Sequence, residues 1–210
     1  MIRRTQLAFV GALALTAVGA TAFAQWPTDP AAPLVLADLT GPQVQPKIAV
    51  IPTGGFYVSW FDSSTGGYDV TLQRLDAAGT EQWPHNGVLV ADRGFSSTQD
   101  YGLSVDTAGN ALLAFRDDRF TGDQITAAKV GPDGTLLWGP DGIQVSTGSA
   151  FVAVPKVAGT TDGNVVVAWT SDSDVMAQKL DPGGAALWGS GVTLIPDSGS
   201  FTLSDLRASL

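Results

Sequence analysis

Three aspartates stand close together in the polar stretch 116–123, at Asp117, Asp118 and Asp123. Calcium prefers several oxygen ligands at once, which makes these carboxylates the candidates for a metal site. Their spacing matches no recognised calcium loop, and the flanking Arg116 and Arg119 are placed to pair with the same charges. We therefore assign no metal and no cofactor, and keep the three aspartates as calcium candidates only.

The remaining groups with catalytic chemistry are few. His85 is the single histidine and lies in a Pro-His-Asn-Gly turn, with no serine and aspartate arranged beside it as in a triad. The chain has no cysteine, which excludes a thiolate nucleophile. A pair of carboxylates hydrolyses glycosides, but nothing in the sequence singles out one pair among 20 acidic residues. The sequence therefore assigns no catalytic residue.

Charge narrows the range of partners. The formal net charge is −9, and this field repels a phosphate backbone, so nucleic acid is excluded as a partner. No basic amphipathic segment is present that would bind anionic lipid.

The first 24 residues have the pattern of a general secretory signal. Arg3 and Arg4 precede the apolar stretch 7–20, and Ala22 and Ala24 supply the small residues that signal peptidase accepts. We predict cleavage after Ala24, a secreted or periplasmic location, and no membrane attachment after cleavage.

An internal repeat organises the rest of the chain. Trp83, Trp138 and Trp188 are separated by 55 and 50 residues, and three turn glycines keep the same spacing. A period near 50 is typical of β-propeller blades. Each repeat is predicted to form four short strands, because its apolar residues alternate or run in short stretches between Gly-rich turns. The predicted first strands are 47–51, 103–105 and 156–158, and the predicted last strands are 88–90, 143–145 and 192–194.

The prediction is an all-β, β-propeller-type chain of about three four-stranded blades. We divide it into a signal peptide (1–24), the strand of an incomplete blade (25–41), three blades (42–94, 95–148 and 149–199) and the start of a truncated fourth blade (200–210). The N-terminal half-blade is expected to contribute a strand at 34–36. Such a chain forms an open arc or a fragment of a larger propeller, and its open sheet edges favour self-association.

The segment 75–83, with Leu-Asp, a turn, Gly and Trp, recurs as 180–188, and 176–181 reads Met-Ala-Gln-Lys-Leu-Asp. Together they give roughly the pattern Ala-Gln-Lys/Arg-Leu-Asp, turn, Gly, Trp, followed in the first repeat by Asn-Gly-Val. This pattern resembles the repeats of secreted bacterial β-propeller proteins, most of which have no assigned activity. The resemblance covers residues 42–199 and departs from the pattern at 125–131, where the Gln and the Asp are missing. It implies a β-propeller fold and no particular activity.

We expect an exported, non-catalytic segment that serves as an extracellular binding or structural module. Loops between the second and third strands of a blade carry binding sites in such folds, so 62–67, 116–123 and 170–174 are expected to bind protein or glycan. The alternative is a fragment of a glycan-active enzyme, a hydrolase or lyase, whose active site lies partly in missing blades.

Overall fold

The computed structural model describes residues 29–95 and 99–197. The predicted signal peptide with its cleavage after Ala24, and the predicted start of a fourth blade at 200–210, lie outside these residues. Within the described residues all regular structure is β-strand, and no helix has the length and apolarity needed to cross a membrane.

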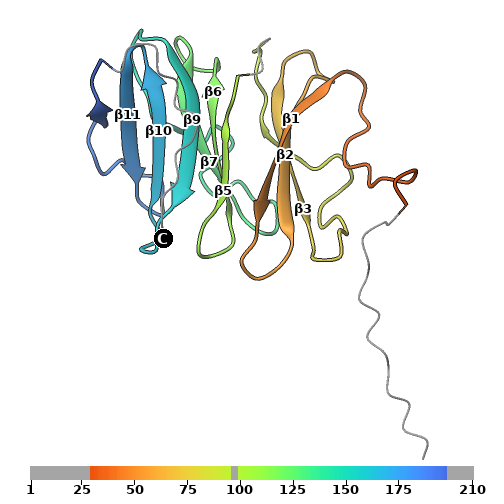
Figure 1. Cartoon of the computed structure of the whole chain (residues 1–210). Helices are drawn as coiled ribbons and strands as arrows, with labels where there is room; N and C mark the ends of the chain where they lie inside the picture. Colours follow the sequence, from red (N-terminus) through yellow and green to blue (C-terminus); the bar gives the residue numbers. More distant parts are fainter. Residues whose placement is uncertain (1–28, 96–98, 198–210) are drawn as a thin grey trace, which may run out of the picture.

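In residues 29–95 and 99–197, twelve strands form three antiparallel four-stranded sheets, each ordered along the chain (Figure 1). The first sheet contains β1 (Gln43–Val50), β2 (Phe56–Asp62), β3 (Asp69–Leu75) and β4 (Val88–Ala91). The second contains β5 (Gly102–Val105), β6 (Ala111–Asp117), β7 (Gln124–Val130) and β8 (Ile143–Gln144). The third contains β9 (Val152–Gly159), β10 (Val165–Ser171), β11 (Asp174–Leu180) and β12 (Val192–Ile195).

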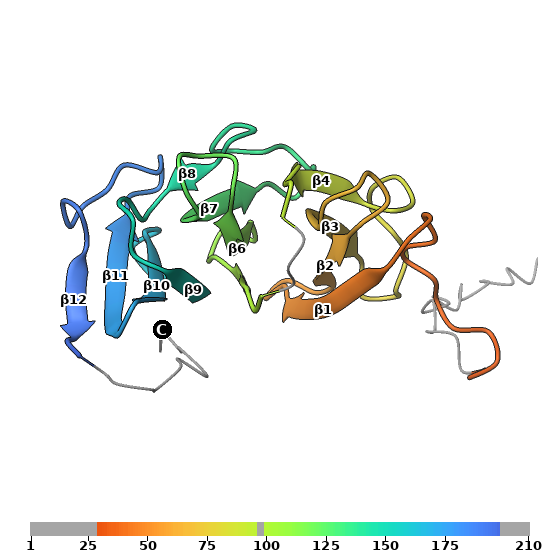
Figure 2. The same cartoon turned by 90° about the horizontal axis from the view of Figure 1, so that it is seen from above.

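The sheets stand side by side in an open arc. Figure 2 shows β1 and β9 on the inner side of the arc and β4, β8 and β12 on its outer side. The fold is therefore all-β and of β-propeller type, as the sequence predicted. The sheets comprise 43–91, 102–144 and 152–195, and each lies inside one of the ranges expected for a blade.

Alternation along the strands decides which side chains fill the space between sheets. Tyr57 and Phe61 of β2 belong to the apolar cluster shared with the second sheet, whereas Val58 and Trp60 point to the other face of the first sheet. Because successive residues of a strand face opposite ways, a strand with sheets on both sides is buried along its whole length. All seven residues of β7, between two neighbouring sheets, are buried.

A tryptophan closes each junction between sheets. The Nε1–H of Trp83 donates to the carbonyl of Pro132 at 3.2 Å, and that of Trp138 donates to the carbonyl of Pro182 at 3.1 Å. Gly134 lies under the Trp83 ring, where an added Cβ would be 3.5 Å from ring atoms. Its φ of 88° also favours glycine. Each indole is therefore seated on the turn of the following sheet.

The innermost strands are joined by charge. Asp100, just before β5, accepts hydrogen bonds from Lys47 of the first sheet, at 2.5 Å, and from Lys156 of the third. Gly102 allows this approach, because an added Cβ would be 2.9 Å from the backbone nitrogen of Val157. One carboxylate thus connects all three sheets.

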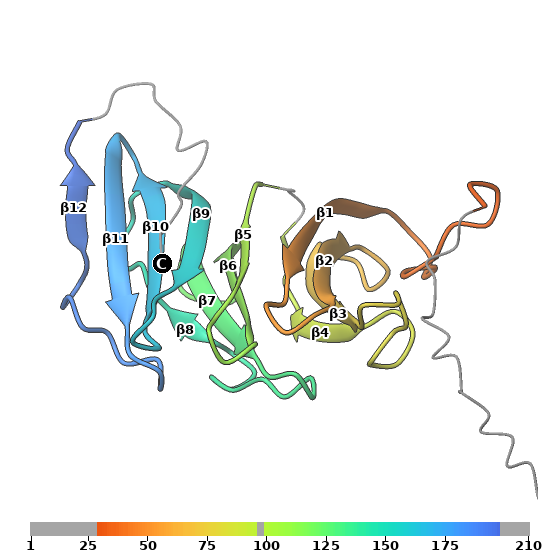
Figure 3. The same cartoon turned by 60° about the horizontal axis from the view of Figure 1, so that its bottom comes forward.

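The segment 29–42 lies on the face of the first sheet that points away from the second (Figures 2 and 3). It forms turns and bends but no strand, so the strand expected at 34–36 is not observed. A last strand of a blade needs the ladder of a preceding strand for its backbone groups, and the described residues provide none there. Leu36 and Ala37 instead pack with their side chains on Val58, Trp60 and Leu75.

Candidate functional site

Two of the three calcium candidates are paired with arginines. Asp117 is fully buried and pairs with Arg119 at 2.8 Å, and Asp123 pairs with Arg116 at 2.6 Å. Among the residues that the structure describes, no three His, Asp or Glu side chains are placed to hold a metal ion. Asp117 and Asp123 are thus engaged with arginines, and the structure does not gather Asp117, Asp118 and Asp123 around a common point.

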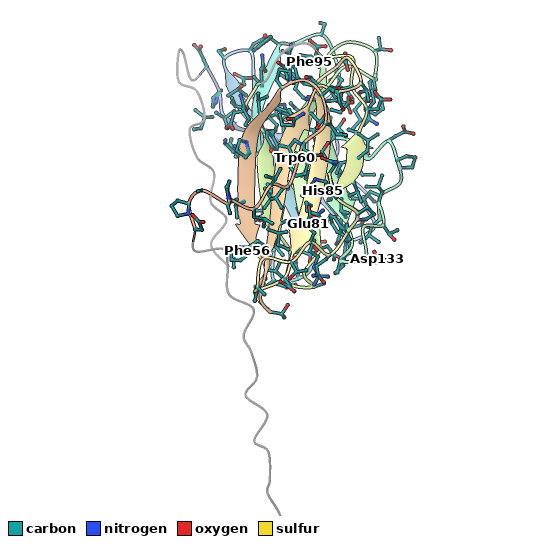
Figure 4. The ribbon with its side chains drawn as sticks, turned by 90° about the vertical axis from the view of Figure 1, so that its right-hand side faces the viewer. Phe56, Trp60, Glu81, His85, Phe95 and Asp133 are labelled. Carbon is teal, nitrogen blue, oxygen red and sulfur yellow. The ribbon has the colours of Figure 1, made fainter. Side chains whose placement is uncertain are left out.

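His85 connects the segment 29–42 to the first sheet. Its Nδ1 lies 3.1 Å from Glu81 (His85 and Glu81 are labelled in Figure 4), and its Nε2 lies 3.3 Å from Asp38. The hydrogen bond to Glu81 is the main cause that raises the pKa of His85, and Asp38 adds to it. The neighbouring Asn86 also exchanges hydrogen bonds with Asp38, at 2.9 and 3.1 Å. These contacts are those of a docking point, with no nucleophile beside the imidazole.

A pocket of about 240 Å³ opens on the face of the first sheet that points away from the second sheet. We call it the aspartate pocket, because three carboxylates contribute to its wall: Asp62, Asp69 and Asp92. The other lining residues are mostly small or polar, with two leucines: Leu39, Ser64, Thr65, Thr71, Asn86, Gly87 and Leu89.

Strand register brings two of these carboxylates together. Asp62 ends β2 and Asp69 begins β3, and the two residues are direct partners across the ladder. Directly opposed residues share one face of the sheet and have Cβ atoms about 4.5–5.5 Å apart, and like charges in this position are destabilising. Both residues are buried, at 4% and 3% exposure. Two acidic side chains are thus buried next to each other on one face of the sheet.

Hydrogen bonds hold the two carboxylates differently. Asp69 accepts from the Thr65 hydroxyl through Oδ2 and from the Arg93 backbone N–H through Oδ1, at 2.7 Å. Asp62 accepts from the Ser64 N–H through Oδ1 at 2.9 Å, whereas its Oδ2 has only a long 3.4 Å contact to the Trp60 indole. Asp69 is therefore fixed at both oxygens, and one oxygen of Asp62 is left weakly engaged.

The Arg93 side chain stabilises the backbone around Asp69. Its guanidinium donates to the Tyr68 carbonyl and lies 4.4 Å from the centroid of the Phe61 ring. Burial lowers the pKa of Arg93 to about 10, although nearby aspartates, Asp117 most strongly, act in the opposite direction. The buried arginine fixes the backbone that donates to Asp69.

Sequence reasoning missed the aspartate pocket, because it looked for charges adjacent in the chain. Asp62 and Asp69 flank the loop 63–68 and become neighbours only when β2 and β3 pair. The available signal was their symmetric position at the two ends of a predicted hairpin.

No protein-family model and no curated protein sequence matches this chain. Among solved structures, an endo-arabinase from Bacteroides thetaiotaomicron is similar, with a TM-score of 0.45 and 16% sequence identity. The similarity covers 74% of this chain and 61% of the endo-arabinase, so the chain spans less than two thirds of that enzyme.

This comparison corrects the first functional expectation. The expected non-catalytic binding or structural module is withdrawn: the similar structure is named an endo-arabinase, a glycan-active hydrolase, and the alternative of a glycan-active enzyme fragment is taken up as a proposal below. At this level of similarity the endo-arabinase indicates no substrate for the present chain, and the chemistry has to be argued from the aspartate pocket.

Proposed function

We propose that this chain is part of a glycan-active enzyme that hydrolyses glycosidic bonds at the aspartate pocket. The observation that carries the proposal is the buried pair of Asp62 and Asp69, which face one pocket from opposed positions of a ladder. Glycoside hydrolysis uses two carboxylates on either side of the scissile bond, one as acid and the other as nucleophile or base.

The different surroundings of the two carboxylates suggest their roles. Two donors stabilise negative charge on Asp69, which suits a nucleophile. The weakly engaged Oδ2 of Asp62 is free of a strong donor and suits the acid that protonates the leaving oxygen. Opposed ladder positions separate Cβ atoms by about 4.5–5.5 Å, near the spacing of about 5–5.5 Å between the carboxyl groups of retaining enzymes.

The lining favours a hydrolase over a lyase. A lyase that abstracts a proton beside a sugar carboxylate needs a cation to neutralise that group. The described residues that line the aspartate pocket include no lysine, arginine or histidine. Hydroxyl and amide groups from Ser64, Thr65 and Asn86 instead provide partners for neutral sugar hydroxyls.

The aspartate pocket is a partial site in this proposal. It lies on a face of the first sheet that is covered by the segment 29–42 and by no further sheet among the described residues. We propose that a neighbouring sheet outside the described residues completes the active site. The predicted export signal at 1–24 and the resemblance of the repeats to those of secreted bacterial β-propeller proteins support action on an extracellular glycan.

The test is release of reducing ends from debranched arabinan, xylan and galactan by the exported full-length protein. Asp62→Asn and Asp69→Asn each keep the side-chain shape and are expected to lower the rate about 100-fold or more, the usual contribution of a general acid or nucleophile. Asp141→Asn, an exposed aspartate outside the pocket, serves as the matched control and should keep the parental rate.

Thermal unfolding of every variant separates loss of catalysis from loss of fold. Two results contradict the proposal: no release from any of the three polysaccharides, or equal rates for the two pocket variants and Asp141→Asn.

A further inference from the structure

A second hollow lies between the loops that follow β6 and β8. Its volume is about 330 Å³, and it shares no residue with the aspartate pocket. Its lining combines one aromatic ring, one ion pair and small residues: Arg116, Gly122, Asp123, Gly148, Ser149 and Phe151. We call it the Phe151 hollow.

The ring of Phe151 is presented to solvent on a fixed backbone. The residue is 53% exposed, which is unfavourable for a large apolar side chain unless something covers it. Its backbone N–H donates to the Asp172 carboxylate at 2.9 Å, and its carbonyl accepts from the Asp172 N–H at 2.7 Å. These bonds fix the backbone that carries the ring before any ligand arrives, which lowers the entropic cost of binding.

Arg116 packs against the Phe151 ring and supplies polar groups. Its guanidinium lies 4.6 Å from the Phe151 ring centroid and 4.9 Å from that of Phe95. Its Nη2 pairs with Asp123 at 2.6 Å, and its side chain is only 10% exposed whereas that of Asp123 is 40% exposed. A cation lies against an aromatic ring, and its carboxylate partner reaches the opening of the hollow.

Gly148 leaves room at the edge of the hollow. A Cβ added to Gly148 would meet nothing within 4 Å, and Gly148 is fixed in place because its carbonyl accepts from Gln124 at 2.9 Å. Gly148 therefore borders open space, and a hydrogen bond to Gln124 of β7 fixes its position.

We propose that the Phe151 hollow binds a neutral sugar ring. A sugar ring has an apolar C–H face, which packs on the electron-rich face of an aromatic side chain, and hydroxyls at its edge that both donate and accept. The Asp123 carboxylate accepts from such hydroxyls, and Arg116 and Ser149 provide donors. This site lies outside the aspartate pocket and goes beyond hydrolysis: it would hold a glycan on the protein whether or not the chain cleaves it.

Charge separates a neutral sugar from the other ligands that an exposed ring attracts. The carboxylate of an acidic sugar gains little, because the Arg116 guanidinium is already paired with Asp123 at 2.6 Å. A cationic peptide gains little, because Arg116 already neutralises Asp123 at 2.6 Å. A neutral polyol uses both charged groups as hydrogen-bond partners without separating them.

The test is a titration of the ¹⁵N-labelled exported protein with xylohexaose and cellohexaose, followed by NMR. We expect shifts confined to amides of 122–123 and 148–151, and an affinity at least tenfold lower for Phe151→Ala. Phe151→Tyr should bind like the parent, because it keeps the ring. The matched control is Leu187→Ala, which removes another exposed apolar side chain, 49% exposed, from the connection between β11 and β12.

Three results overturn the proposal: no saturable shift with either hexasaccharide, shifts that Phe151→Ala leaves unchanged, or stronger binding of trigalacturonate or hexalysine than of both neutral sugars. Because the readout is binding and its variants leave Asp62 and Asp69 intact, failure here and failure of the hydrolytic proposal are distinguishable.

Discussion

Trp138 and Trp188 follow equivalent isolated bridges, Val130↔Leu136 and Leu180↔Ala186, at the outer ends of the second and third sheets. Trp138 is 9% exposed and Trp188 is 38% exposed. The difference comes from the neighbour. Trp138 is seated on the Pro182 turn of the third sheet, whereas no further sheet follows Trp188 among the described residues. The same residue type is therefore a structural anchor at a junction and an exposed apolar side chain at the end of the arc.

Removing the two indoles one at a time tests this difference most directly. Trp138→Ala is expected to lower the free energy of unfolding by about 3–5 kcal/mol, because it leaves a cavity between two sheets. Trp188→Ala should change the free energy of unfolding by about 0.5 kcal/mol, as exposed substitutions do. Urea unfolding followed by circular dichroism measures both.

Trp138→Phe tests the hydrogen bond of the indole separately, because it keeps most of the apolar ring and removes the Nε1 donor to Pro182. We expect an intermediate loss of about 1–2 kcal/mol. Equal effects of Trp138→Ala and Trp188→Ala would show that the junction does not depend on the seated indole.

A smaller effect on the free energy of unfolding is expected at the inner side of the arc, at Asp100. Asp100→Asn keeps the shape and removes the charge that Lys47 and Lys156 share. Burial alone would raise the pKa of Asp100, but hydrogen bonds from Lys156 and Lys47 outweigh it and hold the pKa below its ordinary value. The stabilisation is therefore present above the unfolded pKa of about 4 and is lost as the pH falls through the lowered pKa.

Because the Asp100 side chain is 40% exposed, we expect a loss of only about 1 kcal/mol for Asp100→Asn at pH 7, decreasing in 1 M salt. Urea unfolding at two salt concentrations measures it, and Asp141→Asn is the control. A loss that does not change with salt would mean that the contact is not electrostatic.

The smallest effect concerns the N-terminal end of the arc, where the segment 29–42 covers part of the first sheet. The raised pKa of His85, due first to its hydrogen bond with Glu81, means that the protonated form binds Glu81 and Asp38 better. This contribution is complete below the unfolded pKa of about 6.5 and is lost as the pH rises through the raised pKa.

We expect the amide resonance of Asp38 to shift with pH near neutrality as the segment loosens, and the shift to disappear in His85→Gln. An NMR titration between pH 5 and 9 measures it. An unchanged Asp38 shift in His85→Gln would assign the pH response to another group.

Much of the fold was predictable because it depends on local patterns. Gly-rich turns and short alternating stretches predicted three groups of four strands, and three four-stranded sheets are observed. The pairing of Arg116 and Arg119 with aspartates was also accessible, since the partners lie within a few residues of each other.

The candidate sites were not predictable in the same way. The pair of Asp62 and Asp69 depends on the register of β2 against β3, and the Phe151 hollow depends on how a loop of the second sheet meets the start of the third. The strand expected at 34–36 was not observed because its apolar residues alone could not supply a backbone partner.

By itself the sequence determined where strands and turns lie, because alternation and glycine act over a few residues at a time. The tertiary structure alone decided which tryptophans are buried, which carboxylates oppose each other and which aromatic ring remains exposed. These properties depend on contacts between segments distant in the chain, and the free energy of such contacts is gained only when whole sheets pack together.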